Sequence, residues 1–467
     1  MTLNPVRAMA SEKKLFGTDG IRGVAGQPPL DLKTVFVIGK SLGDFLTSQE
    51  TRPRVLIAED TRESSRWIAE TLAGGLREAG AEASTPGVLT TPGLAYATSA
   101  EGFTCGVMIS ASHNPYQDNG IKVFGANGYK LPDLDELAVE RHIFAALSNG
   151  LALQPYRIAL EPQHALVVPY VAFLRRRAQG IGQPPARRVV MDCANGSAAA
   201  LVREVFSGFG LDLRLLADAP DGRNINLGCG SLHLENLRSA VLAAKADLGV
   251  AFDGDADRAL FVAGHGRIVN GDGVLLVASR YLKRRGELRN GVVVGTVMTN
   301  LGLERALEQE GLRLVRTPVG DKYVLEEMLR LEANLGGEQS GHIIFRDLAT
   351  TGDGLLTAVE MLRIISETGQ PLEHLLEGLQ EFPQTIRNLR VREKIPLAEL
   401  PLVTEQIRAS EQSLGAAGRI VVRYSGTEPL VRVMVEAETE ALVDEHAGAI
   451  VRAIEHSIGN PAGQTPG

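Results

Sequence analysis

The chain has little cysteine, few aromatic residues and no long apolar run. Its 467 residues include three cysteines, Cys105, Cys193 and Cys229, which lie far apart and form no C-x-x-C pair. This spacing argues against a disulfide framework or a cysteine-based zinc site, and it indicates a reducing compartment. No apolar stretch approaches the roughly 18 residues of a membrane span, and the N-terminal stretch MTLNPVRAMASEKK lacks the apolar core of a secretory signal. We therefore expect a cytoplasmic protein with no membrane partner.

Several familiar motifs are missing as well. The sequence contains no G-x-G-x-x-G dinucleotide fingerprint and no G-x-S-x-G nucleophile elbow. Gly39-Lys40-Ser41 resembles the end of a phosphate-binding P-loop, but Thr34 stands where the first glycine is needed, and TVFVIGKSLGDFL predicts an apolar helix. Acidic residues outnumber basic ones by 56 to 48, which argues against nucleic acid as a ligand.

Strand and helix patterns alternate along most of the chain. Residues 54–80, 188–210 and 291–311 each begin with a short β-branched run and continue into an amphipathic helix that ends at glycine. Such repeats predict parallel α/β layers, and their similarity suggests three related domains. Residues 419–426 and 430–438 are instead two β-rich runs followed by a long helix, which predicts a smaller α+β domain. Aromatic residues make up 5% of the chain, so valine, leucine, isoleucine and alanine must build the cores.

The strongest chemical signal is LGVAFDGDADR at residues 248–258. An apolar strand delivers Asp253, Asp255 and Asp257 at alternate positions, separated by Gly254 and Ala256. Three carboxylates held close together repel one another unless a cation or protons lie between them. Oxygen ligands favour a hard ion such as Mg²⁺. A solvated acidic turn is the alternative.

An EF-hand calcium loop does not explain this segment. Arg258 stands where that loop needs glycine, and Gly264 stands where it needs glutamate.

Two segments have the composition of phosphate cradles. GTDGIRG, from residue 17, combines recurrent glycines with Arg22, and RYSGTEPLVRV, from residue 423, flanks a Ser-Gly-Thr turn with Arg423 and Arg432. Guanidinium groups and free backbone N–H groups bind phosphate oxygens well. An ordinary glycine-rich loop and an ordinary hairpin turn remain as alternatives.

Two further segments combine nucleophilic, acidic and basic side chains. MISASHNP places Ser112 beside His113 directly after an apolar strand, which fits a nucleophile or a serine-rich turn bonded to its own backbone. GGEQSGH presents Glu338, Ser340 and His342 in alternation, and an extended segment would put all three on one face. They suit sugar hydroxyls or an amine, whereas an exposed edge strand is the alternative. TPVGDKYV, from residue 317, is a weaker glycine turn.

Four motifs together resemble the α-D-phosphohexomutase superfamily: ISASHNPYQDNGIKVF, FDGDADR, GGEQSGH and RYSGTEP. They follow that family's order and span nearly the whole chain. SASHNPYQDNGIK and GEQSGHIIF, followed by TTGDG, are similar to the branch of bacterial phosphoglucosamine mutases. The resemblance implies three related mixed α/β domains and a C-terminal α+β (TBP-like) domain around a central cleft. The expected boundaries are 1–155, 156–256, 257–372 and 373–467.

The resemblance also implies roles for single residues. Ser112 would carry the phosphoryl group, and the implied catalytic residues around it are His113, Lys122 and Arg22. One Mg²⁺ per subunit would be held by a phosphate oxygen on Ser112 and by Asp253, Asp255 and Asp257. The implied substrate-binding residues are Arg258, Thr317, Gly320, Asp321, Glu338, Ser340, His342, Arg423, Ser425, Gly426, Thr427 and Arg432. Either Lys122 or His113 could act as the general base, and the family favours Lys122.

The implied activity is an isomerase that interconverts glucosamine 6-phosphate and glucosamine 1-phosphate. It would proceed through phosphoserine and glucosamine 1,6-bisphosphate and would supply UDP-N-acetylglucosamine for cell-wall synthesis. The alternative within the superfamily is a phosphoglucomutase or phosphomannomutase. A metal-assisted serine phosphatase and a non-catalytic sugar-phosphate sensor are rivals from other classes. The expected partner is a small hexosamine phosphate, and the expected assembly is a monomer or homodimer.

Overall fold

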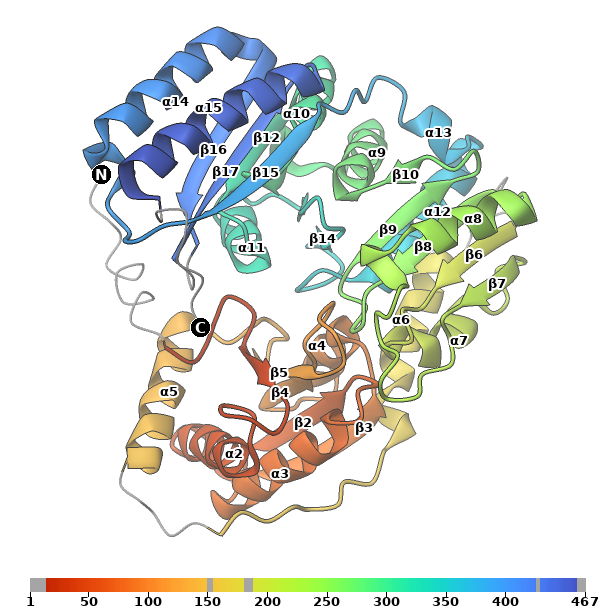
Figure 1. Ribbon diagram of the computed structural model, residues 1–467. Coiled ribbons are helices and arrows are strands. Elements are labelled where there is room, and N and C mark those ends of the chain that lie inside the picture. The colour runs from red at the N-terminus through yellow and green to blue at the C-terminus, as the bar shows by residue number, and fades with distance from the viewer. Residues whose placement is uncertain (1–13, 149–153, 180–187, 426–428, 460–467) are drawn as a thin grey trace. The chain divides into compact units, whose positions relative to one another are not determined.

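The computed structural model describes residues 14–148, 154–179, 188–425 and 429–459 (Figure 1). They form two compact units. The first unit contains the described residues up to Thr296 together with Val315–Glu377, and the second contains Val297–Leu314 with those from Gly378 onward. Among the described helices, none combines the length and the apolar character that a membrane crossing requires.

The first unit begins with a five-stranded mixed sheet. Its order is β1-β5-β4-β2-β3, in which β2 is parallel to both β3 and β4, while β5 is antiparallel to β4 and β1. The strands are β1 (Ile21–Val24), β2 (Arg54–Glu59), β3 (Glu82–Val88), β4 (Cys105–Ile109) and β5 (Asp118–Gly125), and the helices are α2 (Leu32–Thr47), α3 (Ser65–Glu78), α4 (Thr91–Ala100) and α5 (Asp133–Ser148).

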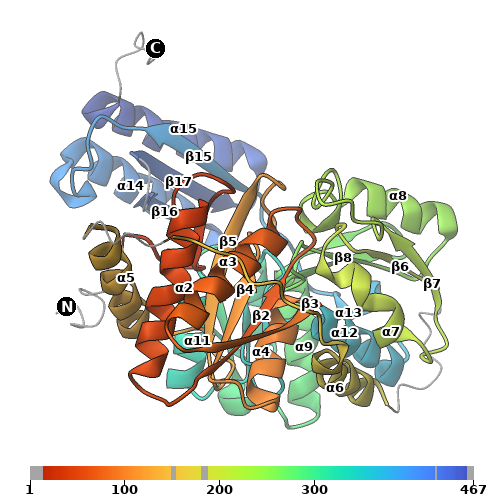
Figure 2. The same cartoon turned by 90° about the horizontal axis from the view of Figure 1, so that it is seen from below.

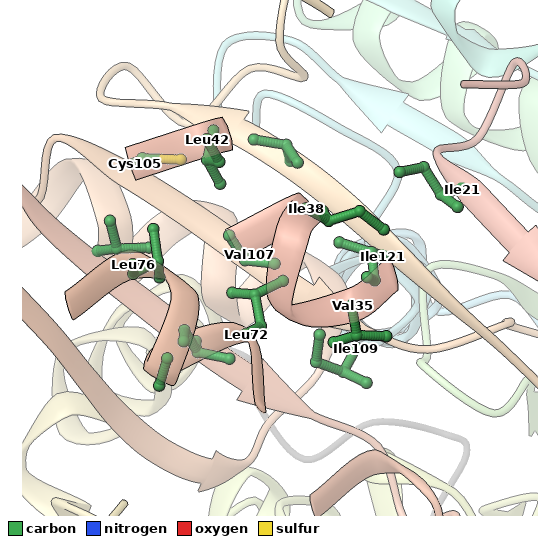
Figure 3. Packing of buried hydrophobic residues seen from close by; sticks show 14 of the residues in the cluster. Ile21, Val35, Ile38, Leu42, Leu72, Leu76, Cys105, Val107, Ile109 and Ile121 are labelled. Carbon is green, nitrogen blue, oxygen red and sulfur yellow. The ribbon is translucent and has the colours of Figure 1, made fainter. Parts of the chain in front are cut away.

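The core beneath this sheet is aliphatic, as the low aromatic content predicts. Ile38 of α2 and Leu72 of α3 lie with Val107 of β4 in one buried cluster (Figure 3). The helices α2 and α3 run side by side (Figure 2). Their approach requires Gly39, because a Cβ atom there would lie 2.2 Å from the Leu72 carbonyl oxygen. The P-loop-like glycine therefore serves helix packing, and the predicted apolar helix is confirmed.

The second sheet repeats this arrangement. Its order is β10-β9-β8-β6-β7, with β6 parallel to β7 and β8 and with β9 antiparallel to β8 and β10. The strands are β6 (Arg188–Asp192), β7 (Asp212–Leu216), β8 (Leu248–Phe252), β9 (Ala259–Ala263) and β10 (Ile268–Val269), and the helices are α6 (Val168–Ala178), α7 (Val202–Phe206) and α8 (Glu235–Ala244). The next helix, α9 (Gly271–Arg284), packs against β13 and β14 of the third sheet. The expected boundary at 256/257 falls between β8 and β9.

The third sheet has the order β12-β11-β13-β14. Here β13 is parallel to β11 and antiparallel to β14. The strands are β11 (Val292–Thr296), β12 (Arg313–Thr317), β13 (Leu335–Gly337) and β14 (Ile343–Phe345), and the helices are α11 (Asp321–Arg330), α12 (Gly354–Thr368) and α13 (Leu372–Leu375).

All three sheets carry a loop at the same place in their topology. In each, a strand that runs parallel to its inner neighbour turns back through a short loop into an antiparallel strand: β4 into β5, β8 into β9 and β13 into β14. These loops contain Ser112, the three aspartates and Glu338, respectively. The sequence pattern of related α/β domains is therefore confirmed, and the repeat places the chemical motifs at equivalent strand ends.

The second unit is the expected α+β fold. Its antiparallel sheet has the order β15-β17-β16, and α14 and α15 pack against it (Figure 1). Its elements are α10 (Leu301–Gln309), β15 (Gln384–Arg390), α14 (Pro401–Leu414), β16 (Gly418–Tyr424), β17 (Leu430–Ala437) and α15 (Glu440–Ile458).

Candidate active site

Ser112 lies on the loop that follows β4. Every residue of this strand is buried, and the loop beyond it carries Ser112 in the left-handed region, with φ of +54°. The backbone N–H of Ser112 donates to Ser110 Oγ at 2.9 Å. Its own hydroxyl donates to Asp253 Oδ2 at 2.5 Å and lies 3.3 Å from His113 Nδ1. The structure thus brings together a hydroxyl, a carboxylate from another sheet and an imidazole.

Two side chains with N–H donors hold the Ser112 loop in this left-handed conformation. The Arg62 guanidinium donates to the carbonyl oxygens of Ser112 and Asn114 at 3.1 and 2.6 Å. Asn226 Nδ2 donates to the same two oxygens at 3.0 and 3.1 Å. Arg62 is itself paired with Asp60, and both side chains are fully buried. The hydroxyl is therefore positioned by a rigid polar clamp, as reactive groups require.

The three aspartates that follow β8 form one cluster. Asp253, Asp255 and Asp257 are buried, and one oxygen from each lies within 4.8 Å of the other two. Burial raises the pKa of Asp253 well above its usual range, and the neighbouring carboxylates of Asp257 and Asp255 raise it further. For Asp255, burial also acts to raise the pKa, but Lys122 outweighs it and lowers the pKa below its usual range.

The cluster fits a hard divalent cation. Asp255 Oδ1 and Asp257 Oδ1 are buried and accept no hydrogen bond from the described part of the chain. Buried acceptors without partners cost free energy, and a cation would relieve both this cost and the repulsion between the carboxylates. An all-oxygen donor set suits Mg²⁺ in particular. The side chain of Thr91, at the start of α4, steadies the cluster by donating to Asp255 Oδ2 at 2.5 Å.

Lys122 brings a buried positive charge against the aspartates. It belongs to β5, opposite Met108 of β4, and its Nζ lies 2.8 Å from Asp255 Oδ2, 3.1 Å from Asp19 Oδ2 and 3.5 Å from Asp257 Oδ2. Burial acts to lower the pKa of Lys122, but these carboxylates raise it above its usual range. Lys122 is consequently an ammonium group in the resting protein.

His113 has the opposite electrostatic environment. Burial lowers the pKa of His113 to about 4, and the cations Arg258 and Arg22 contribute to the shift. The imidazole is therefore neutral near pH 7 and has a lone pair available. His113, Arg22 and Arg258 share a cavity of about 400 Å³ that is lined by Leu15, Gly17, Thr18, Asp19, Gly20, Arg22, His113, Asp257, Arg258, Val319, Gly320, Asp321, Glu338 and His342.

The GGEQSGH segment forms a tight hairpin turn between β13 and β14. The expectation of an extended stretch with three side chains on one face is wrong, because Gly341 N–H donates to the Glu338 carbonyl and closes the turn. Glu338 and His342 stand at the two ends of this turn, where Glu338 N–H donates to the His342 carbonyl, and both line the cavity. The Ser340 hydroxyl is buried, accepts no hydrogen bond from the described residues, and does not line the cavity.

The neighbouring TPVGD loop also lines the cavity. Gly320 N–H donates to Glu338 Oε1 at 3.0 Å, and Gly320 has a φ of +133°. Asp321 begins α11 and lines the cavity with Gly320. Thr317 lies outside the cavity, and its hydroxyl contacts the carbonyls of Gly295 and Pro318 at 3.2 and 2.9 Å. Thr317 therefore anchors the loop.

The second unit carries the separate arginine pair. Arg423 of β16 is directly opposite Arg432 of β17, and burial together with Arg432 lowers the pKa of Arg423. Ser425 follows β16, is buried, and its N–H donates to the Leu430 carbonyl at 2.8 Å. Two like charges opposite each other on a sheet are unfavourable alone and attract an anion. Gly426 and Thr427 lie outside the described residues.

Several site residues were missed from the sequence. Asp19 lies within the GTDGIRG motif, and its carboxylate contacts Arg22, Lys122 and Lys130. Lys130, Arg62, Asn226 and Thr91 had no motif to mark them, since their importance depends on partners from distant segments.

Comparisons with known proteins cover almost the whole chain. Models of the phosphoglucomutase/phosphomannomutase α/β/α domains I, II and III match residues 13–149, 169–266 and 270–382, and the C-terminal domain matches 387–453. A protein called phosphoglucosamine mutase from Solibacter usitatus is 52% identical over 96% of this chain and 99% of its own, and one from Bacillus subtilis is 43% identical over 96% and 99%. A phosphoglucomutase/phosphomannomutase family structure from Burkholderia thailandensis has a TM-score of 0.76 at 25% identity and covers 96% of this chain and 98% of its own. The chain belongs to the phosphoglucomutase/phosphomannomutase family, within the α-D-phosphohexomutase superfamily.

Proposed function

We propose that this chain interconverts glucosamine 6-phosphate and glucosamine 1-phosphate. The observation that carries the proposal is the 2.5 Å contact between the Ser112 hydroxyl and Asp253, inside a triad of buried carboxylates and beside the Lys122 ammonium. A hydroxyl that accepts a phosphoryl group needs such a setting, because phosphoryl transfer is mainly a matter of positioning and charge neutralisation.

We assign the triad and Ser112 as the residues that hold one Mg²⁺. Asp253, Asp255 and Asp257 supply carboxylate oxygens, and phosphorylated Ser112 would add a phosphate oxygen. When bound, the ion neutralises charge on the phosphoryl oxygens. The N–H of Arg258, which donates to Asp253 Oδ1 at 3.2 Å, fixes one carboxylate, and Thr91 fixes another.

In the first half-reaction, phosphoserine 112 transfers its group to a free hydroxyl of the sugar monophosphate. The bond from phosphorus to Ser112 Oγ breaks and a bond from phosphorus to the sugar oxygen forms. The sugar hydroxyl loses its proton to a base on the chain, and Ser112 Oγ takes up a proton as it leaves. His113 and Lys122 are the two candidate bases. The family resemblance favours Lys122, which would first have to give up the proton that its carboxylate partners hold on it in the resting protein, whereas His113 is already neutral. Arg22 and Arg258 neutralise the equatorial oxygens.

In the second half-reaction, the bisphosphate presents its other phosphate to Ser112. Ser112 Oγ forms a bond to that phosphorus as the bond from phosphorus to the sugar oxygen breaks. The serine proton passes to the base, the sugar oxygen takes up a proton, and the isomeric monophosphate leaves. We propose that Arg423, Ser425 and Arg432 hold whichever phosphate is not reacting, together with Gly426 and Thr427. The facing guanidinium groups of Arg423 and Arg432 support this assignment, because they form a ready dianion site.

The choice of sugar rests on the relatives. Those with 42–52% identity over nearly their full length are called phosphoglucosamine mutases. Phosphoglucomutase or phosphomannomutase activity remains the alternative, since the sugars differ at C2 and a few polar contacts decide between them. Glu338, Ser340, His342, Thr317, Gly320 and Asp321 are the residues that we propose for recognition or support of the sugar.

We also propose the domain boundaries, the cellular location and the oligomeric state of the enzyme. We propose four domains with boundaries at 1–155, 156–256, 257–372 and 373–467. The four separate sheets support the number of domains, whereas the boundary at 256/257 divides the second sheet between β8 and β9. A cytoplasmic location is consistent with Cys105, Cys193 and Cys229 being free, buried thiols. Our prediction for the assembly is a monomer or a homodimer.

The test compares kcat/KM for the 6-phosphates of glucosamine, glucose and mannose. The highest value is expected for glucosamine 6-phosphate, and better use of a neutral sugar would overturn the amino-sugar assignment while leaving a mutase.

Ser112→Ala should lower turnover by about 10⁴-fold or more and abolish phosphate labelling of the protein. Ser207→Ala, which removes an exposed hydroxyl on a helix end, is the matched control. Release of inorganic phosphate at the rate of isomerisation would instead indicate a phosphatase.

A further inference from the structure

Lys130 occupies a place in the first unit that the reaction scheme above does not use. Its Nζ donates to Asp19 Oδ1 and to Asp321 Oδ2, each at 2.6 Å. The side chains of all three residues are mostly buried, with exposed fractions of 16%, 25% and 14% for Lys130, Asp19 and Asp321. One ammonium group thus bridges the Gly17–Gly20 turn and the loop that forms a wall of the cavity, although Lys130 and Asp321 are 191 positions apart.

The contacts continue toward the reacting groups. Asp19 Oδ2 lies 3.1 Å from Lys122 Nζ, which in turn lies 2.8 Å from Asp255 Oδ2. Asp321, Lys130, Asp19, Lys122 and Asp255 therefore form an unbroken series of alternating charges, which we call the charge ladder. It joins the wall of the cavity to the acidic triad.

Local structure holds Lys130 at the centre of the ladder. The chain leaves β5 and turns back on itself, with Gly125 N–H donating to the Tyr129 carbonyl at 2.9 Å, and Gly128 adopts a φ of +76°. The Thr350 hydroxyl donates to the Gly128 carbonyl at 2.7 Å. A Cβ atom at Gly128 would lie 2.7 Å from the Ala95 carbonyl oxygen, so the turn cannot shift freely. The ammonium group is thereby aimed at the two carboxylates.

We propose that Lys130 is a positioning residue. It holds the TPVGD loop (residues 317–321), which we propose for sugar recognition, at a fixed distance from Ser112 and the three aspartates. Asp19 and Asp321 are two mostly buried carboxylates held against the same nitrogen atom, so they would repel one another if that nitrogen were absent. Asp321 is rigidly coupled to Gly320, whose N–H orients Glu338 at 3.0 Å. Displacement of Asp321 would therefore misplace the groups that face the sugar. The inference rests on the proposed mutase function.

The pKa shifts agree with this geometry. Burial acts to raise the pKa of Asp321, but Lys130 outweighs it and lowers the pKa, whereas Asp19 pushes it upward. For Asp19, burial likewise opposes ionisation, and Lys122 and Lys130 together lower its pKa well below the usual range. Both carboxylates are therefore ionised, Asp321 mainly through Lys130 and Asp19 through Lys122 and Lys130 together.

The central experiment is a double-mutant cycle on Lys130 and Asp321, with steady-state kinetics on glucosamine 6-phosphate. Lys130→Met should raise KM by about tenfold or more while lowering kcat less, because binding geometry is lost and the reacting groups remain. Lys130→Arg should recover part of the loss. Asp321→Asn should lower kcat/KM by itself, but in the Lys130→Met background it should cost little further, because it also removes the unpaired carboxylate.

Controls separate this role from general damage. Lys40→Met removes a lysine that forms an ion pair with Asp44, one turn further along α2, and this substitution should leave KM unchanged. If Lys130→Met leaves KM within twofold of the wild type, or if the losses in the double variant simply add, the positioning role is wrong. Thermal unfolding without substrate tests the repulsion independently: Lys130→Met should lower Tm, and Asp321→Asn should restore part of it. Failure of the wild type to convert glucosamine 6-phosphate would refute the proposed function and leave this second readout intact.

Discussion

The acidic triad of the first unit and the arginine pair of the second unit both place like charges together, but they are compensated differently. The negative charge of Asp255 is compensated within the protein by the Lys122 ammonium at 2.8 Å and by a hydrogen bond from the Thr91 hydroxyl at 2.5 Å. Neither Arg423 nor Arg432 makes an ion pair with any residue in the part of the chain that the structure describes, and they face each other across two strands.

This difference fits the roles that we propose for the two regions. A reacting phosphoryl group needs fixed partners, because reorganisation during transfer would raise the barrier. A phosphate that is held and exchanged needs cations whose charge has not been used already. We infer that charges compensated inside the protein contribute to stability and rate, whereas uncompensated ones contribute to affinity at the expense of stability. Each of the following substitutions tests one side of that contrast.

The largest effect is expected at the triad. Asp255→Asn removes one cation ligand and one partner of Lys122, so kcat should fall by about 10³-fold and Mg²⁺ affinity by about 100-fold or more. Steady-state kinetics at saturating Mg²⁺ and calorimetric titration of the ion measure the two effects. An unchanged Mg²⁺ affinity would mean that the triad is not the metal site.

A change of similar size is expected in the clamp on the Ser112 loop. Arg62→Met leaves fully buried Asp60 without its cation and should lower the free energy of unfolding by about 3–5 kcal/mol. Adding Asp60→Asn should restore much of that stability, as urea unfolding would report. The double variant should keep a lowered kcat, because the Ser112 and Asn114 carbonyls still lack the guanidinium donor. Full recovery of kcat would contradict the positioning role of Arg62.

A smaller effect of opposite sign on stability is expected in the arginine pair. Arg432→Met should raise KM for the sugar phosphate by about 10- to 100-fold, because a charge-assisted phosphate contact is lost. It should also raise the free energy of unfolding by about 0.5 kcal/mol, because the repulsion with Arg423 ends. Arg419→Met is the matched control: Arg419 pairs with buried Glu436 at 2.9 Å, so its loss should lower stability with little effect on KM.

The smallest effect on activity is expected at Asp353, a buried carboxyl that is held by neutral donors and whose predicted effect is on stability. Burial raises the pKa of Asp353 to about 7, although the Leu356 N–H and the Tyr170 hydroxyl favour its charged form. The folded state therefore keeps a proton that the unfolded state releases, and the associated stability is present below about pH 4 and is lost as pH rises to about 7. Asp353→Asn should remove a slope of up to about 1.4 kcal/mol per pH unit over that window. Urea unfolding at pH 5 and pH 7 measures the slope, and identical slopes in both proteins would refute the assignment.

Much of the site could be predicted from the sequence because its parts are local. Ser112, the three aspartates and Glu338 each follow a short apolar strand, and strand ends are recognisable from neighbouring residues alone. The Glu338 segment was misjudged in shape, since the hydrogen bond from Gly341 N–H to the Glu338 carbonyl turns alternation into a hairpin. Of the three alternating residues, Glu338 and His342 line the cavity and Ser340 does not.

The sequence by itself determined which chemical groups the protein has, the order in which the strands deliver them, and the family whose motifs they match. The tertiary structure decided how those groups are compensated: which carboxylates surround Lys122, which donors hold the Ser112 loop, and that Asp19 and Lys130 join the triad to the TPVGD loop. The physical reason is range. Strand and turn preferences act between neighbouring residues, whereas the electrostatic balance of a buried charge depends on every group that folding brings to within a few ångströms of it.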